Sequence, residues 1–311
     1  MNYCSISWNK LTENETFHLQ GLKKISPRLK HLNNLNLSSE ELRREAASRA
    51  DKMSIQGVQP KLSAVIDIKN SSFKIVDYNG KYILKPPHLL YPEVAENESL
   101  TMSLAQSLGL KTPLHGLITN KDNTKTYFIK RFDRYGQSGK NHQEDFAQLA
   151  GKTRDTKYNY SMEKVVQLVD QYCTYPVVEK VKLFKRVIFC FLTGNEDMHL
   201  KNFSIVIENN IVKLSPVYDM LNTTILLENT KEEIALPING KKNNLNFKDL
   251  IEYFGFKYCE LNLKTIETFF NEIKKTSTRW NAQIDHSYLN LENRNKYKDL
   301  LLQRMACLQL I

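Results

Sequence analysis

The chain has 311 residues, of which 41% are hydrophobic and 25% are charged, and its formal net charge is +10. This composition is that of a globular protein with one or two domains, and it excludes the disordered and fibrous classes. The hydrophobic runs are far below the roughly 18 residues that a membrane-spanning helix needs. Because the N-terminus also lacks a signal-peptide pattern, we expect a cytoplasmic protein that makes no membrane contact.

The positive charge is typical of a protein with a polyanionic partner, such as a nucleotide, a nucleic acid or an acidic protein. The basic residues are spread over the whole chain, and no helix-turn-helix, zinc or sheet-based recognition motif accompanies them. We therefore expect no direct nucleic-acid binding. The five cysteines lack pair spacing, which argues against disulfides and structural zinc, so most are expected to be buried reduced thiols.

In chain order, the first informative stretch is Ser38-Ser39-Glu40-Glu41, where a serine is expected to cap the helix that follows. Residues 53–63 then read MSIQGVQPKLS and contain a single glycine, Gly57. The backbone N–H groups around Gly57 and Val58, together with Lys61, would cover the phosphates of a nucleotide. The alternative is a tight turn before a strand predicted over 62–68, because the stretch is neither GxGxxG nor a Walker A loop.

Further along, an Asn-Gly pair at 79–80 predicts a hairpin turn followed by a strand that ends at Lys85. A helix is predicted over 93–110, and Glu98 lies on its apolar face. A buried carboxylate needs a cation, and Lys85 is the natural partner. Glu96 is the alternative partner for Lys85, and Glu98 would then point to water.

Two more strands are predicted over 114–119 and 126–132, and a Gly- and Ser-containing loop follows them. This change from strands to helices predicts a hinge, with one domain over 1–133 and a second over 134–311. The hinge backbone would bond an adenine edge, which makes Lys130 and Phe132 candidates for nucleotide contact. From residue 142 onward the pattern, HQEDFAQLAG included, is mostly helical, and the helix over 178–192 is the expected buried centre.

The main functional clue is the stretch FCFLTGNEDMHLKNFSIVI over 189–207. It places Asp197 and Asn202 in a polar loop between that helix and a short predicted strand, and Asp219 follows seventeen residues later. This spacing matches the protein-kinase active site, in which one Asp positions the hydroxyl nucleophile and the other two residues hold magnesium. His199 and Lys201 would add cationic side chains beside Asp197 to hold the nucleotide. The alternative is an ordinary loop, where Asp and Asn are common for conformational reasons.

Taken together, these motifs resemble the HipA family of bacterial serine/threonine kinases, which are the toxins of persistence-linked toxin–antitoxin systems. The resemblance is carried by SIQGVQPKLS (54–63), ILKP (83–86), ENE (96–98), KRFDR (130–134), HQEDFAQLAG (142–151), GNEDMHLKNFSI (194–205) and SPVYDML (215–221). It implies an α+β, two-lobed protein-kinase-like fold, with a small antiparallel-sheet N-lobe and a larger, mostly helical C-lobe.

The resemblance also implies roles for single residues and partners for the chain. Asp197 would be the catalytic aspartate, Asn202 and Asp219 the magnesium ligands, Lys85 the lysine that binds ATP, and Ser54 an autophosphorylation site. The short N-terminal part resembles the compact HipT-type toxins. The implied partners are an aminoacyl-tRNA synthetase as substrate, a HipB-like DNA-binding antitoxin and a small HipS-like protein.

Two other interpretations remain open from the sequence. A small-molecule kinase of the same fold uses a similar set of Asp, Asn and Asp. A pseudokinase or a nucleic-acid-associated binding module would keep the fold and depend on its charge instead of on ATP.

Overall fold

The computed structural model of the chain describes residues 3–13, 15–49, 59–227 and 231–311. Two compact units are present. Unit 1 comprises Met1–Leu100, Pro113–Ser138 and His286–Leu289, and unit 2 comprises Thr101–Thr112, Gly139–Asp285 and Asn290–Ile311. The chain first passes from unit 1 into unit 2 within helix α3 (Val94–Ser107). The domain boundary expected between residues 133 and 134 stays a prediction.

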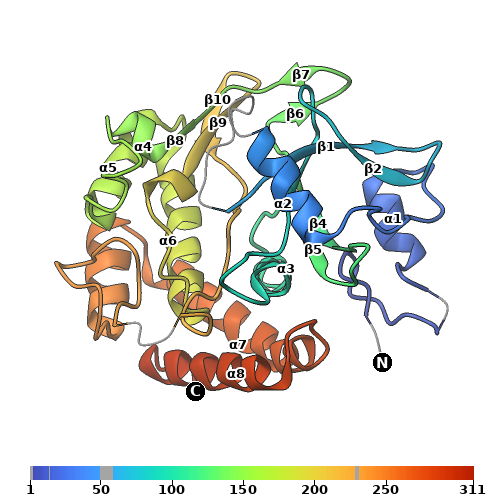
Figure 1. The fold of residues 1–311 in the computed structure, drawn as a ribbon. Coiled ribbons are helices and arrows are strands. Elements are labelled where there is room, and N and C mark those ends of the chain that lie inside the picture. Colours follow the sequence, from blue (N-terminus) through green and yellow to red (C-terminus); the bar gives the residue numbers. More distant parts are fainter. Residues whose placement is uncertain (1–2, 14, 50–58, 228–230) are drawn as a thin grey trace. The chain divides into compact units, whose positions relative to one another are not determined.

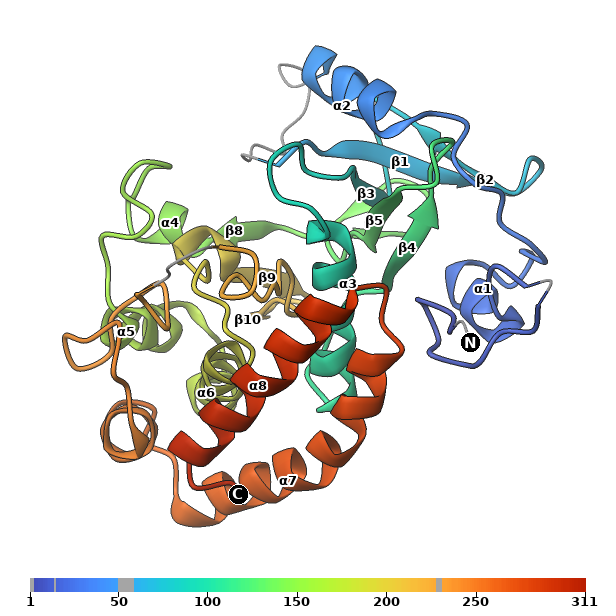
Figure 2. The same cartoon turned by 60° about the horizontal axis from the view of Figure 1, so that its bottom comes forward.

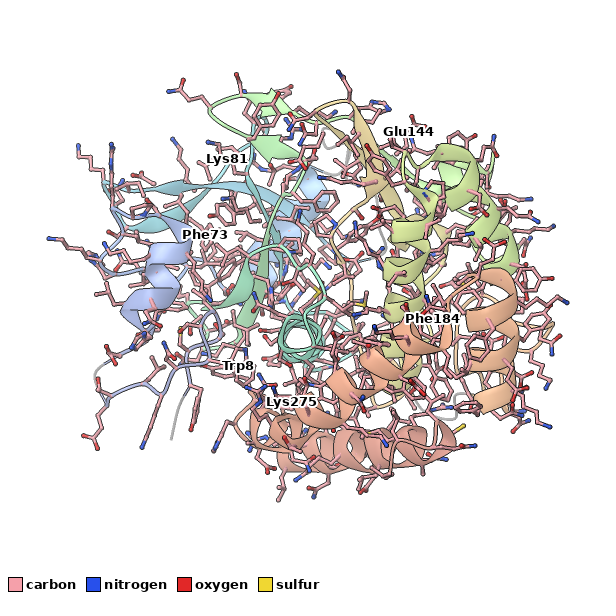
Figure 3. The ribbon with its side chains drawn as sticks, turned by 180° about the vertical axis from the view of Figure 1, so that it is seen from behind. Trp8, Phe73, Lys81, Glu144, Phe184 and Lys275 are labelled. Atoms are coloured by element: carbon pink, nitrogen blue, oxygen red, sulfur yellow. The ribbon has the colours of Figure 1, made fainter. Side chains whose placement is uncertain are left out.

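A five-stranded antiparallel sheet forms the centre of unit 1. Its order is β2-β1-β3-β5-β4, and the strands are β1 (Leu62–Asp67), β2 (Ser72–Ile75), β3 (Tyr82–Lys85), β4 (His115–Thr119) and β5 (Lys125–Lys130). Aromatic residues from three strands meet on one face: the ring of Phe73 lies 5.3 Å from that of Tyr82 and 5.1 Å from that of Phe128. Figure 3 shows Phe73 within this part of unit 1. Such cross-strand aromatic contacts stabilise the sheet and help to fix its register.

The predicted Asn-Gly hairpin is wrong: residues 77–79 form a bend, and only Asn79 of the pair has a positive φ. Strand β1 lies between β2 and β3, so the bend joins strands that are not neighbours. The connecting chain crosses the end of β1, where the amide of Lys81 donates to the carbonyl of Ala64 at 2.9 Å. A Cβ atom on Gly80 would lie 1.8 Å from Ser63 Oγ, so the close approach of the two backbones requires glycine there. The order of the strands therefore depends on tertiary pairing and not on the local Asn-Gly signal.

Two helices precede this sheet, α1 (Leu19–Ile25) and α2 (Ser39–Ser48). The expected cap of α2 is confirmed, because the Glu41 amide donates to Ser38 Oγ at 3.2 Å and the Ser38 amide donates to Glu41 Oε2 at 2.7 Å. This reciprocal capping box satisfies two N–H groups that the helix itself leaves unpaired. Leu42 and Ala46 of α2 belong to the same hydrophobic core as the sheet, and α2 lies beside β1 (Figure 2).

Helices make up most of unit 2. They are α4 (Phe146–Leu149), α5 (Met162–Tyr172), α6 (Pro176–Leu192), η2 (Leu200–Asn202), the π-helical η3 (Lys248–Tyr258), α7 (Leu263–Asp285) and α8 (Leu291–Cys307). The buried helix expected over 178–192 is confirmed as α6, and its Phe184 packs against Phe254 of η3 and Phe269 of α7 with ring centroids 6.3 and 6.2 Å apart. Figure 3 labels Phe184, and Figure 1 shows α7 and α8 side by side. Helix α6 is therefore the rigid element that precedes the candidate active-site loop.

Unit 2 also has a three-stranded antiparallel sheet, which the sequence did not predict in full. Its order is β10-β9-β8, with β8 (Gln143–Asp145), β9 (Ser204–Glu208) and β10 (Ile211–Leu214). The helical expectation for HQEDFAQLAG is wrong at 143–145, because these polar residues pair with β9. Asp145 ends β8 and caps the four-residue helix α4, so the helix begins only at Phe146. Two further short strands are β6 (Arg134–Tyr135) in unit 1 and β7 (Gly139–Lys140) in unit 2.

The sulfur chemistry agrees with the sequence. All five cysteines are free thiols, and all except Cys307 are buried, which confirms the expectation of buried reduced thiols. Over the ranges that the structure describes, no helix combines the length and the apolar character needed to cross a bilayer.

Candidate active site

The loop over 193–203 begins where α6 ends, and we call it the catalytic loop because it carries Asp197, which the sequence predicts to be the catalytic acid. Thr193 Oγ1 donates to the carbonyl of Phe189 at 2.8 Å and so closes the last turn of the helix. Gly194 follows with a φ of +64°, and a Cβ atom there would lie 2.5 Å from Leu300 and 2.6 Å from Thr224. Only glycine combines this left-handed conformation with such crowding. The catalytic loop therefore leaves α6 in a fixed direction.

One buried amide links the two acids that the sequence singled out. Asn195 Oδ1 accepts from the amide of Asp197 at 3.1 Å, and Asn195 Nδ2 donates to the carbonyl of Asp219 at 3.4 Å. Within the same loop, Asn202 Nδ2 donates to the carbonyl of Asp197 at 2.8 Å. Unit 2 thus brings Asp197, Asn202 and Asp219 together through side-chain amides that bond to the backbone. Asn195 was missed in the sequence because its role depends on a segment 24 residues away.

The segment before Asp219 is held by a buried arginine. Arg186 Nη2 on α6 donates to the carbonyl of Ser215 at 2.6 Å, and the Tyr218 hydroxyl donates to the carbonyl of Lys201 at 3.1 Å. Asp219 itself has a φ of +52°, a left-handed conformation that Asp tolerates better than most residues. The chain that leads to this acid is therefore held at two points, Ser215 and Tyr218.

The expected pair of cations beside Asp197 is not what the structure shows. Lys201 Nζ forms an ion pair with Asp145 Oδ2 at 2.7 Å. His199 Nε2 lies 3.8 Å from Asp197 Oδ1 and 2.7 Å from Lys157 Nζ. Burial lowers the pKa of His199, so its ring is neutral and its Nε2 accepts from the Lys157 ammonium group. Nucleotide contact by His199 and Lys201 stays a prediction.

Tyr158 is a neighbour of Asp197 that the sequence did not suggest. Its hydroxyl donates to Asp197 Oδ1, and its ring meets the His199 ring edge-on with centroids 5.0 Å apart. Burial, and then the hydrogen bond to Asp197, raises the pKa of the Tyr158 hydroxyl, which keeps it protonated as a donor. The two residues are 39 positions apart in the sequence, and no sequence motif predicts their contact.

In unit 1, the predicted pair of Lys85 and Glu98 is present. Lys85 Nζ lies 2.6 Å from Glu98 Oε1, and the two side chains are only 4% and 3% exposed. The ammonium group also lies 5.5 Å from the centroid of the Tyr127 ring. Glu96, the alternative partner, is not the carboxylate in this ion pair, and burial raises its pKa to about 7. Nucleotide binding by Lys85 and Glu98 stays a prediction.

The other candidate residues belong to unit 1 or fall outside the described ranges. Lys61 directly precedes β1, and Phe132 is half-buried just after β5. Lys130 ends β5, and its amide donates to the carbonyl of Leu114 at 2.7 Å, so this N–H group is already used within the protein. Three further residues predicted to belong to the site, Ser54, Gly57 and Val58, lie outside the described residues.

The candidate magnesium ligands fit the ion by their chemistry. Mg²⁺ prefers oxygen ligands and is usually held by one or two carboxylates together with water and substrate phosphates. Asp219 supplies a carboxylate, and Asn202 retains Oδ1 because its Nδ2 is engaged by the carbonyl of Asp197. Within the described ranges no group of three or more His, Cys, Asp or Glu side chains could hold a metal. Magnesium binding by Asn202 and Asp219 stays a prediction.

Comparison with known proteins places these features in a family. Residues 53–280 match the HipA-like C-terminal domain. The chain is 34% identical over 243 residues to a putative kinase of Haemophilus influenzae, a match that covers 72% of this chain and 69% of the relative. It is 32% identical over 181 residues to the putative kinase Y4mE of Sinorhizobium fredii, covering 55% of this chain and 43% of that protein. It is 26% identical over 210 residues to the serine/threonine-protein kinase toxin HipA of Shewanella oneidensis, covering 61% of this chain and 47% of HipA. The chain thus matches less than half the length of the last two relatives.

Solved structures agree on the fold. The HipA chain from a Shewanella oneidensis complex of HipA, HipB and operator DNA superposes with a TM-score of 0.66 and 20% identity, over 89% of this chain and 72% of HipA. The proinflammatory kinase CtkA of Helicobacter pylori superposes with a TM-score of 0.55 and 17% identity, over 78% of this chain and 92% of CtkA. These likenesses confirm the predicted α+β, kinase-like fold. With the domain match over 53–280, they show that the chain belongs to the family of proteins with a HipA-like C-terminal domain.

Proposed function

We propose that this protein is an ATP- and Mg²⁺-dependent serine/threonine protein kinase that acts as the toxin of a HipA-type toxin–antitoxin system. The observation that carries the proposal is the grouping of Asp197, Asn202 and Asp219 around the buried Asn195 amide. It is an acid, an amide and a second acid in the order that kinase chemistry uses. The kinase names of the relatives and the buried ion pair of Lys85 and Glu98 support the same conclusion.

The residues then have distinct roles in phosphoryl transfer. Asp197 accepts the proton of a serine hydroxyl as its oxygen attacks the γ-phosphorus of ATP, and the bond from that phosphorus to the leaving ADP oxygen breaks. Lys85 binds the phosphates, and Glu98 keeps its ammonium group in place. Asn202 and Asp219 hold Mg²⁺, which when bound neutralises charge on the phosphates. Catalysis of this kind is mostly positioning and electrostatic stabilisation, so fixed donors and acceptors matter most.

The substrate and the partners are proposed on the likeness to HipA. The Shewanella oneidensis protein is found in a complex with HipB and operator DNA, which supports a HipB-like, DNA-binding antitoxin for this chain. We further propose an aminoacyl-tRNA synthetase as the substrate, a small HipS-like partner and autophosphorylation at Ser54. With these roles the protein would act in the cytoplasm.

The proposal is tested by incubating the purified protein with γ-labelled ATP and Mg²⁺. We expect self-labelling on Ser54, and we expect Asp197→Asn to lower the rate about a hundredfold or more, because it removes the proton acceptor. Asp299→Asn, at an exposed acid on α8, is the matched control and should keep full activity. Comparing the phosphoproteins of cells that express the wild type and Asp197→Asn would then identify the substrate.

Two results would overturn parts of the proposal. Phosphate transfer to a small molecule such as an aminoglycoside or a sugar, without protein labelling, would favour a small-molecule kinase of the same fold. If Asp197→Asn inhibited growth as strongly as the wild type, toxicity would not depend on phosphoryl transfer, and a binding module would explain it better.

A further inference from the structure

The segment over 152–160, which we call the tyrosine segment, joins α4 to α5 (Figure 1). It contacts the catalytic loop through hydrogen bonds. The amide of Leu200 donates to the carbonyl of Lys157 at 3.3 Å, and Lys157 Nζ donates to His199 Nε2 at 2.7 Å. The segment is itself folded into a turn, since the amide of Asn159 donates to the carbonyl of Thr156 at 2.9 Å. Its position is therefore set by contacts with the catalytic loop on both the backbone and the side chains.

A third contact, between Tyr158 and Asp197, involves the acid that is proposed to be catalytic. The Tyr158 hydroxyl donates its proton to Asp197 Oδ1, and its ring rests against the His199 ring. In the proposed reaction, the acceptor hydroxyl must donate to this same carboxylate. The Tyr158 hydroxyl is thus hydrogen-bonded to Asp197 Oδ1, the atom to which the hydroxyl of an incoming serine would donate.

We propose that Tyr158 is an internal stand-in for the acceptor, and that its hydroxyl marks the subsite where the hydroxyl of a peptide serine or threonine binds. This inference rests on the proposed kinase function and names a part of its site. The incoming side chain displaces the Tyr158 hydroxyl from Asp197, and the His199 ring forms one wall of the subsite. The pair of Lys157 and His199 retains the tyrosine segment until an acceptor competes for the carboxylate.

The side chain of Tyr158 is suited to reversible displacement. Tyr158 is 37% exposed, so its side chain can move out into solvent. The side chain of its partner Asp197 is 47% exposed, so an acceptor can reach the carboxylate. A hydrogen bond to a charged group is stronger than a neutral one, but the acceptor replaces it with a bond of the same kind. The net cost of the exchange is therefore small for a hydroxyl, and it is larger for a ligand that offers Asp197 no donor.

The test measures phosphoryl transfer by wild type, Tyr158→Phe and Lys157→Met, with a degenerate serine-containing peptide mixture as acceptor. Tyr158→Phe keeps the ring and removes the competing hydroxyl, so we expect KM for the peptide to fall about tenfold while KM for ATP is unchanged. Hydrolysis of ATP in the absence of peptide should also rise, because Asp197 Oδ1 can then accept from a water molecule in place of the Tyr158 hydroxyl. Lys157→Met should likewise lower KM for the peptide and raise ATP hydrolysis in the absence of peptide. Tyr160→Phe is the matched control, because Tyr160 lies in the same segment and its ring faces Lys164 Nζ at 5.6 Å.

An unchanged or increased KM for the peptide in Tyr158→Phe, with a melting temperature equal to that of the wild type, would overturn the inference. A fall in kcat with no change in either KM would also overturn it, because Tyr158 would then be positioning Asp197. The two proposals fail separately. If the wild type transfers phosphate and Tyr158→Phe behaves like Tyr160→Phe, only the acceptor subsite is wrong. If the wild type neither binds ATP nor transfers its phosphate, the kinase function is wrong.

Discussion

Helix α3 carries a buried carboxylate, Glu98, and a partly buried one, Glu96, whose charges are compensated to different extents. Glu98 is ion-paired with Lys85, so its charge is compensated although the side chain is almost inaccessible. Glu96 lies two residues earlier, where burial is the largest influence and the charge of Lys125 only partly opposes it, so its pKa is raised to about 7. A buried carboxylate with a close cation stays charged, and one without such compensation tends to stay protonated.

This difference predicts a pH-dependent effect of Glu96→Gln. The folded-state pKa of Glu96 lies above its ordinary value of 4.5, so the folded protein binds this proton more tightly than the unfolded chain does. The stability that results is fully present below pH 4.5 and is lost as the pH rises through 7. At pH 8 we expect the amide variant to be more stable than the wild type by about 2–3 kcal/mol, and at pH 5 by much less. Urea unfolding at both pH values measures this.

The control for that experiment is Glu267→Gln, at an exposed acid on α7. It should leave the free energy of unfolding nearly unchanged at either pH. An equal gain for Glu96→Gln at pH 5 and pH 8 would contradict the assigned cause, because the gain would then come from packing and not from ionisation.

The catalytic loop shows how one residue fixes the course of an element. Gly194 combines a positive φ with atoms that crowd the position of an added Cβ, whereas Gly240 has a φ of +73° and nothing within 4 Å. A left-handed conformation costs a residue with a Cβ about 1–2 kcal/mol at either site. At Gly194 overpacking adds about 1–3 kcal/mol.

We therefore expect Gly194→Ala to lower the free energy of unfolding by clearly more than Gly240→Ala does. Urea denaturation of the two variants isolates the crowding, since both share the strain of the left-handed conformation. Equal losses in the two would mean that the loop moves aside without cost. A larger loss in Gly194→Ala, together with weakened phosphoryl transfer, would link the path of the loop to the reaction.

For helices and strands, the sequence predicts the single element better than it predicts which strands pair with one another. The helical rhythm of α6 and the serine cap of α2 are local signals, and both predictions are confirmed. Strand β8 consists of Gln143, Glu144 and Asp145, three polar residues that have no strand signature and become a strand only by pairing with β9. In the same way, spacing along the chain predicts the candidate acids Asp197 and Asp219, whereas the contacts of Asn195 and Tyr158 are with residues distant in sequence. What sequence reasoning missed is tertiary in origin.

For the molecule as a whole, each of the two compact units contributes residues to the proposed function. Lys85 and Glu98 belong to unit 1, and Asp197, Asn202 and Asp219 belong to unit 2. A ligand that binds only the folded protein raises its stability, by about 2.7 kcal/mol when its concentration is 100 times Kd. Mg²⁺-ATP is the ligand that the proposed roles require.

We expect Mg²⁺-ATP to raise the melting temperature of the wild type, and we expect chelation of Mg²⁺ to remove most of that increase. Asp219→Asn should lose the increase because it weakens the proposed metal site, while Asp299→Asn should keep it. Thermal unfolding followed by fluorescence, with and without EDTA, provides the measurement. An increase of equal size in Asp219→Asn would show that the nucleotide binds without help from this acid.

The amide of Asn195 has a consequence for how this site tolerates change over evolutionary time. Its Oδ1 accepts from the Asp197 amide, and its Nδ2 donates to the Asp219 carbonyl, so one side chain connects two parts of the chain that are distant in sequence. A carboxylate in its place would keep the first bond and lose the second, and an aliphatic side chain would lose both. An aliphatic residue at position 195 would therefore loosen the backbone at both acids in a single step, whereas aspartate would loosen it only at Asp219, so the residue found here helps to tell active descendants from inactive ones.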